Sequence, residues 1–257
     1  MITHSFDPHS LPIFGPEDLY TKREKLADIC IITFSKAVID HAQAHFDCEV
    51  AAIINTLSGD KPIYTMDYKG RRIAFFMSAI TAAGCATNLE DAILLTGAEH
   101  YILFGSCGAL DSAITEGKLI VPTQAFRDEG LSYHYKESGD YIDVKNAPKV
   151  AAFMDELGIP YVKGRTWTTD AIYRETRNNA AKRKAEGCIA VDMECSGIQA
   201  LCDFKNLQYY TFFYTGALLD APKWDKRILM GELERDHQLR NFVVALEIAA
   251  RLDLNQE

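Results

Sequence analysis

Short apolar runs alternate with amphipathic segments along most of the chain. This alternation predicts eight strands and six helices. The expected strands are Asp28–Thr33, Ala51–Leu57, Arg72–Ser78, His100–Gly105, Lys118–Pro122, Tyr161–Thr166, Ile189–Met193 and Gln208–Tyr214. The expected helices are Lys36–Ala44, Cys85–Leu95, Ala147–Leu157, Arg177–Glu186, Glu194–Phe204 and Gly231–Leu252. Strands interleaved with helices in this way are typical of an α/β protein.

The number of strands and the lack of a linker define the expected architecture. There are more strands than a simple sheet requires, so we expect a large twisted mixed sheet between two helix layers, a three-layer α/β fold. No Pro/Gly/Ser-rich linker and no internal repeat divide the sequence, which favours a single domain over residues 1–257. The polar stretch Tyr133–Lys145 is expected to form a surface loop.

Composition and charge limit the classes of function. The 257 residues are 48% hydrophobic and 25% charged, as in ordinary globular proteins. A formal net charge of -9 argues against a general binder of nucleic acid, which needs a basic face. No apolar run approaches the ~20 residues of a membrane span, and the segment Met1–Pro16 lacks the features of a signal peptide. We therefore expect a cytoplasmic protein without membrane or nucleic-acid partners.

The cysteines and histidines give no sign of a metal site. Seven cysteines, an odd number with no Cys-x-x-Cys pair, indicate reduced and mostly buried thiols. His41 and His45 share the i,i+4 spacing of one helical face, but no carboxylate or thiolate partner is obvious. We expect no metal and no bound cofactor.

Two strand ends carry candidate binding residues. The apolar run from Tyr101 ends at Gly105, which is followed by Ser106. Ligands of α/β sheets bind beyond the carboxyl ends of strands, where Ser106 could bond a sugar hydroxyl or an anion. The alternative is a tight strand-to-loop turn. Further on, Asp192-Met193-Glu194 lies where a strand runs into a helix, although Glu is also a common first-turn residue.

Two polar segments also follow strands. Arg127–Tyr135 is dense in charged and aromatic residues, and its simpler interpretation is an exposed loop with internal ion pairs. Thr168–Tyr173 follows another strand, and its simpler interpretation is a helix cap built from Thr and Asp.

These four segments, in this order, resemble the nucleoside phosphorylase superfamily. That group includes uridine phosphorylases, hexameric purine nucleoside phosphorylases and methylthioadenosine/adenosylhomocysteine nucleosidases. Leu103–Leu110 is similar to its Gly-Thr-x-Gly-Gly/Ala segment, and Arg127–Tyr135 to Arg-Asp-Glu-Gly-Thr-Ser-Tyr-His-Tyr of the uridine-phosphorylase-like members. Thr168–Tyr173 is similar to Ser-Ser-Asp-x-Phe-Tyr, and Val191–Gly197 to Val-Glu-Met-Glu-x-x-x-Gly. The resemblance implies the phosphorylase/hydrolase-like α/β fold and sites completed by a neighbouring subunit.

The resemblance also implies roles for individual residues. Glu194 would bind the ribose 2′- and 3′-hydroxyls, Met193 would pack under the sugar, and the turn at Gly105 and Ser106 would touch phosphate and sugar. Asp192 stands where the family has a Glu. The residues near the base would be Thr169, Ile172 and Tyr173.

The sequence departs from the family at the phosphate and base contacts. The early Gly-Asp-Pro-x-Arg loop corresponds to Thr33–Ala37, and Leu103 replaces an arginine, so two phosphate contacts are missing unless Lys36 or a partner subunit compensates. The Asp that protonates purines has no counterpart at Thr215-Gly216, which leaves Asp220 as a substitute. Among the uracil-reading positions, only Arg177 could donate to a carbonyl.

The leading hypothesis is a nucleoside phosphorylase of the uridine-phosphorylase-like branch. It would use inorganic phosphate to release free base and ribose 1-phosphate, as a homodimer or a hexamer built of dimers. One alternative is a hydrolytic nucleosidase, which the missing arginines favour. The other is a nucleoside-binding protein that kept Glu194 and lost efficient catalysis.

Overall fold

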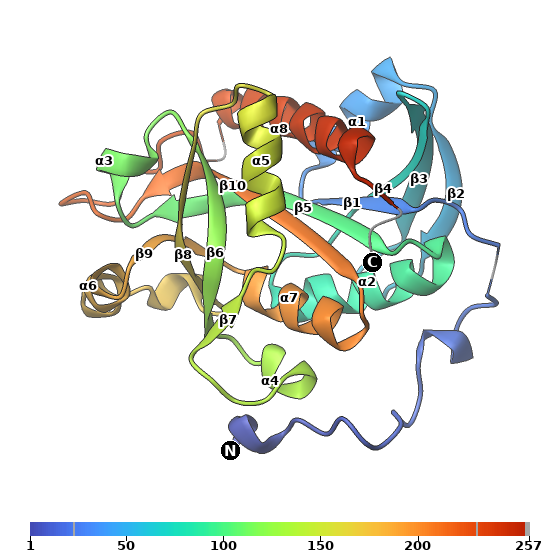
Figure 1. Ribbon diagram of the computed structural model, residues 1–257, viewed down its shortest axis with the longest axis horizontal. Coiled ribbons are helices and arrows are strands. Elements are labelled where there is room, and N and C mark those ends of the chain that lie inside the picture. Colours follow the sequence, from blue (N-terminus) through green and yellow to red (C-terminus); the bar gives the residue numbers. More distant parts are fainter. Residues whose placement is uncertain (23, 230, 255–257) are drawn as a thin grey trace.

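A single mixed sheet organises the chain (Figure 1). The computed structural model describes residues 1–22, 24–229 and 231–254. The strands are β1 Ile29–Thr33, β2 Glu49–Ile54, β3 Lys61–Tyr68, β4 Arg71–Met77, β5 His100–Ala109, β6 Leu119–Asp128, β7 Tyr141–Asp143, β8 Tyr161–Thr169, β9 Cys188–Asp192 and β10 Gln208–Leu218. The α-helices are α1 Lys36–His45, α2 Ala82–Thr96, α3 Ser112–Thr115, α4 Ser132–Tyr135, α5 Ala147–Glu156, α6 Arg177–Ala185, α7 Cys195–Phe204 and α8 Glu232–Arg251. Short 3-10 helices are η1 Ile2–His4, η2 Pro16–Asp18 and η3 Ile172–Arg174.

The strand order is β10-β6-β8-β9-β5-β1-β4-β3-β2, and β7 pairs with β6. Parallel pairs such as β1–β5 and β5–β10 occur beside antiparallel pairs such as β3–β4 and β5–β9, so the sheet is mixed. Strand β10 pairs with both β5 and β6, which closes a ring through β10, β6, β8, β9 and β5. The mixed sheet confirms the expected fold class, and the ring closure is a feature that the sequence did not indicate.

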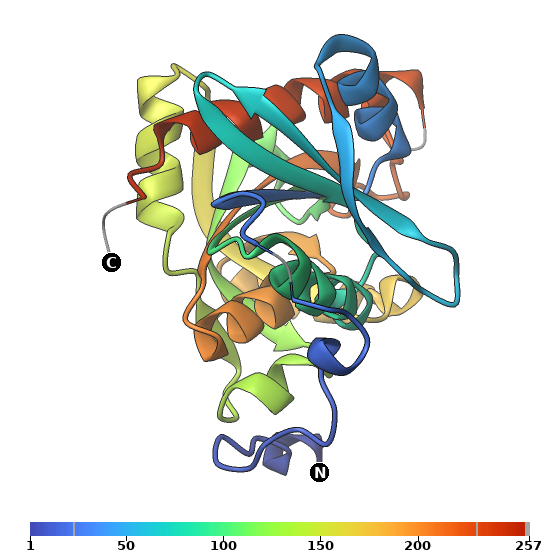
Figure 2. The ribbon, with the colours of Figure 1, turned by 90° about the vertical axis from the view of Figure 1, so that its right-hand side faces the viewer.

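Helices cover both faces of the sheet (Figures 1 and 2). Helices α1, α5 and α8 lie on one side, and α2 and α7 pack together on the other. The central strands are therefore buried on both faces, which explains why β1 is a continuous apolar run rather than an alternating one. This arrangement confirms the layered α/β architecture.

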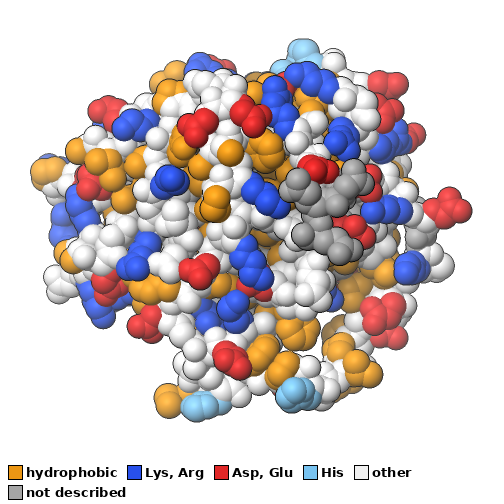
Figure 3. Space-filling view, in the orientation of Figure 1, with side chains coloured by type: hydrophobic (Ala, Val, Ile, Leu, Met, Phe, Trp, Pro, Cys, Tyr) orange, Lys and Arg blue, Asp and Glu red, His pale blue; other side chains and the backbone are white. Residues whose placement is uncertain are grey.

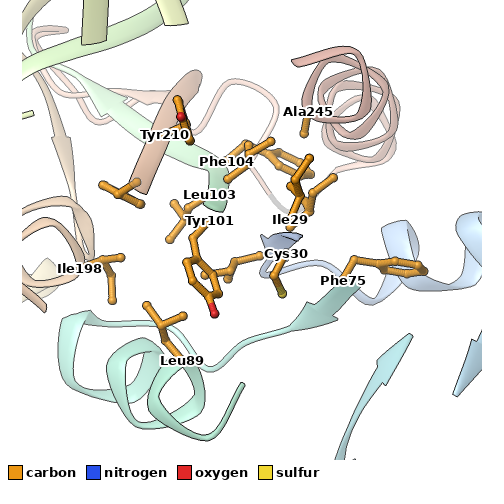
Figure 4. Close-up of a cluster of buried hydrophobic side chains, with 14 of the residues drawn as sticks. Ile29, Cys30, Phe75, Leu89, Tyr101, Leu103, Phe104, Ile198, Tyr210 and Ala245 are labelled. Carbon is orange, nitrogen blue, oxygen red and sulfur yellow. The ribbon is translucent and has the colours of Figure 1, made fainter. Parts of the chain in front are cut away.

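Figure 4 shows the core where the layers meet. Ile29 and Tyr101 come from the neighbouring strands β1 and β5 and are fully buried. The Tyr101 hydroxyl donates to the Ala98 carbonyl at 2.8 Å, so this aromatic core residue leaves no polar atom unpaired. On the face opposite Tyr101, where Ile29 lies near Ala245 of α8, Phe242 of α8 packs against Phe75 with 5.7 Å between ring centroids.

Two strands and several strand ends differ from the predictions. Strand β3 carries Pro62 near its start, which weakened its signal as a strand. The prediction that Tyr133–Lys145 is a loop is wrong in part, because Tyr141–Asp143 pairs with β6 and Ser132–Tyr135 is helical. Strands β6 and β8 extend to Asp128 and Thr169, since their polar ends pair with each other and are mostly buried.

The surface carries charges of both signs, and the cysteines are unpaired and mostly buried. On the face shown in Figure 3, Lys and Arg side chains are interspersed with Asp and Glu. None of the described helices is both long and apolar enough to cross a lipid bilayer. All seven cysteines are free, and only Cys48 is partly exposed.

Gly197 of α7 tests the packing of α7 on α2. A Cβ atom there would lie 2.7 Å from Ala82 Cβ and 3.1 Å from Leu131 Cδ2. We expect Gly197→Ala to lower the free energy of unfolding by about 1–2 kcal/mol in net terms, because overpacking outweighs the ~1 kcal/mol gained in helix propensity. Urea denaturation would measure it, with Gly139→Ala as the control, because its nearest atoms are 3.9 Å away. An unchanged or raised stability in Gly197→Ala would contradict this packing.

Candidate active site

One cavity of about 690 Å³ opens at the carboxyl end of β1 and along the second half of β5. Its walls come from the end of β1, the second half of β5, the β9–α7 junction, η3, β10 and the start of α8. The prediction that the strand ends at Gly105 is wrong, because Gly105–Gly108 continues β5 and pairs with β10. Segments more than 100 residues apart therefore meet there, as expected for ligand sites in α/β sheets.

Glu194 lies at the inner wall of this cavity. The residue is 8% exposed, and its Oε1 accepts a hydrogen bond from the Thr81 backbone N–H at 2.7 Å. Burial and the neighbouring Asp192 carboxylate together raise the pKa of Glu194 to about 8, and the N–H of Thr81 opposes this shift. Because its carboxyl group lines the cavity, Glu194 can take a ligand hydroxyl.

The donor to Glu194 comes from a strained backbone. Thr81 has φ +72°, a conformation that β-branched residues rarely adopt. Its hydroxyl accepts from the Gly84 N–H at 3.3 Å and caps α2, which offsets part of the strain. Strain of this kind persists where surrounding contacts fix it, and here it directs the Thr81 N–H at Glu194.

Asp192 is bound within the protein rather than free for a ligand. Its Oδ2 accepts from the backbone N–H of Glu194 at 2.8 Å and of Cys195 at 2.6 Å. Its Oδ1 accepts from the hydroxyls of Thr166 at 2.8 Å and Thr168 at 3.0 Å. Burial raises the pKa of Asp192, and these four hydrogen bonds lower it in part. Asp192 therefore fixes the start of α7 and the position of Glu194.

The Arg127–Tyr135 segment packs against the start of α7. Arg127 is buried, donates to Ser132 Oγ at 2.8 Å and lies over the Tyr133 ring at 4.3 Å. Glu129 accepts from Ser132 N–H at 3.0 Å and from Ser196 Oγ at 2.9 Å. None of these residues lines the cavity, so this segment is structural and not the exposed loop that its composition suggested.

Five more of the predicted site residues join Glu194 and Asp192 at the cavity wall. These are Gly105, Ser106, Ile172, Tyr173 and Met193. Ser106 is exposed to the cavity, and a Cβ on Gly216 of β10 would lie only 2.9 Å from Ser106 Cβ, so glycine leaves room for the Ser106 side chain. Tyr173 is 97% exposed at the cavity wall.

Four predicted residues lie elsewhere. Lys36 pairs with Asp40 at 2.6 Å and lines a separate cavity of about 300 Å³. Asp220 accepts from the N–H and hydroxyl of Ser112. Thr169 and Arg177 are likewise bonded within the protein, to Ala171 N–H and the Pro222 carbonyl. None of these four residues lines the cavity, although each lies close in sequence to a residue that does.

The cavity also contains residues that the sequence did not single out. They are Phe34, Ser35, Glu175, Tyr214, Trp224, Glu234 and Gln238. Most lie in loops or on α8, where no pattern distinguishes a cavity residue from a solvent-exposed one. For Glu175, the only indication in the sequence was the clustering of charged and aromatic residues near Tyr173, which is common in binding sites.

The charged residues that line the cavity within the described chain are all carboxylates. They are Glu175, Asp192, Glu194 and Glu234, with no Lys, Arg or His among them. The described residues also contain no cluster of three or more metal-ligating side chains. This electrostatic environment favours a developing positive charge in the cavity and disfavours an anion.

Comparisons with known proteins agree with this geometry. The Phosphorylase superfamily profile matches residues 28–228. The chain is 25% identical over 138 residues to a DeoD-type purine nucleoside phosphorylase of Colwellia psychrerythraea, covering 52% of this chain and 59% of that protein. It is also 25% identical to the DeoD-type enzyme of Alkaliphilus metalliredigens, over 74% of this chain and 79% of that protein.

A solved structure shares the fold. The futalosine hydrolase mutant of Helicobacter pylori superposes with a TM-score of 0.70 at 16% identity, covering 87% of this chain and 99% of that one. The chain spans about half to three fifths of the length of several curated relatives that it matches.

Removing the Asp192 carboxylate should destabilise the protein. Asp192→Ala leaves two backbone N–H groups and two hydroxyls without their acceptor, so we expect a loss of about 2–4 kcal/mol in the free energy of unfolding. Asp192→Asn should cost less, because the amide oxygen can accept from the backbone while its NH₂ donates to the threonine hydroxyls. Urea denaturation of both variants measures the difference, and equal losses would contradict the capping role.

Glu194 should make stability depend on pH. Its pKa is about 8 in the folded state and 4.5 ordinarily, so the folded state retains a proton that the unfolded state releases between these values. Raising the pH from 5 to 9 should therefore destabilise the wild type relative to Glu194→Gln, by on the order of a few kcal/mol. Thermal melts of both proteins at the two pH values measure this. A melting-temperature difference that is the same at pH 5 and 9 would contradict it.

Proposed function

Because the chain belongs to the phosphorylase superfamily, we propose that it cleaves the N-glycosidic bond of a nucleoside, with Glu194 binding the ribose diol. The observation that carries this proposal is the buried Glu194 carboxyl, held by Thr81 at the wall of the cavity. Two ribose hydroxyls that donate to Glu194 would favour its ionised form and lower its raised pKa on binding.

The cavity suits the chemistry of this bond. Cleavage of a ribosyl C–N bond passes through an oxocarbenium-like state with positive charge on the sugar. Glu194, once the ribose hydroxyls donate to it and favour its ionised form, stabilises such a charge more than it stabilises the neutral substrate. Met193 beside Glu194 supplies an apolar surface for the sugar ring, and Ser106 supplies a hydroxyl.

We propose water as the nucleophile. Phosphate requires cations or free N–H donors, and no Lys or Arg of the described chain lines the cavity. At the start of α7, the N–H groups of Glu194, Cys195 and Ser196 already donate to Asp192 and Thr168. Hydrolysis to free base and free pentose therefore fits this cavity better than phosphorolysis.

Phosphorolysis is the second candidate. It is favoured by the matches to proteins named purine nucleoside phosphorylases. On this route a cation would come from a second copy of the chain, in a dimer or an assembly of dimers. The exposed apolar side chains of Ile80 and Ile172 at the cavity provide a surface that such a copy could cover.

The two candidates differ in their products. Purified protein is incubated with uridine, thymidine, inosine, adenosine and methylthioadenosine, with and without inorganic phosphate. We expect base release at the same rate in both conditions, with free pentose as the second product. Phosphate-dependent release with pentose 1-phosphate would establish phosphorolysis instead, and a failure to cleave any nucleoside in the panel would count against the proposed activity.

Glu194→Ala should lower kcat/KM by at least about 10²-fold, because the variant cannot bind the diol or stabilise the sugar cation. Glu137→Gln is the matched control, since Glu137 is an exposed carboxylate outside the cavity. Thermal melts of both variants confirm that each is folded. A Glu194→Ala variant that retains wild-type kcat/KM would contradict the role of Glu194.

A further inference from the structure

We propose that Glu175 is the general acid that protonates the leaving base, an inference that rests on the function proposed above. A purine or pyrimidine anion is a poor leaving group, so the C–N bond breaks more readily if a proton is delivered to the base. A carboxylic acid that faces the cavity and is not bound elsewhere would provide that proton.

Glu175 meets this description. It follows η3, lines the cavity and is partly buried. Its carboxyl group makes no hydrogen bond or ion pair with the described part of the chain. Burial alone raises the pKa of Glu175 to about 7, so much of it is protonated at neutral pH. The geometry therefore supplies an unpaired, proton-bearing carboxyl group at the cavity wall.

The neighbours of Glu175 indicate the base end of the cavity. Arg177 donates to the Pro222 carbonyl at 2.6 Å, which ties the segment after η3 to the loop that carries Trp224. Trp224 and Tyr173 both line the cavity and are exposed to it. Two flat aromatic side chains are suited to stack on a planar heterocycle. Glu194, by contrast, lies with Met193 at the β9–α7 junction, where we place the sugar.

The other acids nearby are less suitable. Asp192 accepts four hydrogen bonds within the protein, and Asp170 accepts from the Gly130 N–H and does not line the cavity. Asp220 is bonded to Ser112 outside the cavity. Glu234 lines the cavity from α8, an element apart from the η3 and Trp224 segments.

The step balances as follows. The C1′–N bond breaks, its electron pair goes to the base nitrogen, and the Glu175 carboxyl gives its proton to the base. The oxygen of water bonds to C1′ and loses a proton to solvent. The Glu175 carboxylate then takes a proton from solvent, which restores the acid and leaves free base and free pentose as the products.

The test compares two leaving groups. A nucleoside base needs a proton, whereas the nitrophenolate released from para-nitrophenyl riboside is a stable anion that leaves without one. We expect Glu175→Gln to lower kcat on the best nucleoside by about 10²–10⁴-fold and to keep kcat on para-nitrophenyl riboside within about fivefold. Glu137→Gln should change neither rate, and melting temperatures show whether each variant is folded.

The pH profile gives a second measurement on the nucleoside alone. Wild-type kcat/KM should fall at high pH as Glu175 loses its proton, while the residual rate of Glu175→Gln should level off there. The charged groups that share the cavity with Glu175 are Asp192, Glu194 and Glu234, and they are unchanged in this comparison.

Three results would overturn the assignment. They are a Glu175→Gln variant with near wild-type turnover of the nucleoside, an equal loss on both substrates, and an alkaline fall that persists in the variant. Each of these leaves nucleoside cleavage by the wild type intact. A wild type that cleaves neither substrate, whatever the phosphate concentration, would instead refute the proposed function and Glu175 with it.

Discussion

The candidate site depends on one buried carboxylate at the end of β9. Asp192 gathers two threonine hydroxyls from β8 and two backbone N–H groups from the start of α7. A buried charge is tolerated only when hydrogen bonds replace its lost solvation, so these contacts hold strand and helix in one geometry. Glu194 follows Asp192 by two residues, so the same contacts fix where Glu194 lies. The close approach of α7 to α2 at Gly197 then brings the Thr81 N–H within reach of Glu194.

Much of the fold follows from the sequence because burial leaves a periodic record. The longer helices begin within a few residues of their predicted positions, and the strands buried on both faces appear as unbroken apolar runs. The hydrophobic pattern does not predict strands that form mainly through pairing with another strand. Strand β7 has three residues and owes its existence to pairing with β6, and the polar ends of β6 and β8 are strands only because each pairs with the other. Ring closure through β10 is a long-range event that no local window reports.

The site was predictable in part, for a similar reason. Met193 and Glu194 directly follow β9, and Ser106 lies in the second half of β5, so a local motif near the carboxyl end of a strand was enough to find them. Lys36 and Asp220 follow β1 and β10 in sequence, yet Asp40 and Ser112 bind them outside the cavity. Glu175 and Trp224 lie in irregular segments, and only the fold reveals that both face the cavity.

The ring of strands has a consequence for how the protein is made. Strand β5 forms the middle of the sheet early in the chain, but β10 pairs with it about one hundred residues later. During synthesis, the first half of the chain emerges with one edge of β5 unpaired, the edge that β10 will later occupy. The free N–H and C=O groups of this edge can pair with strands of other molecules. Contacts of such long sequence separation also close slowly. Because α8 also lines the cavity, the cavity can form only near the end of translation, and until then the β5 edge is a point at which the nascent chain can aggregate.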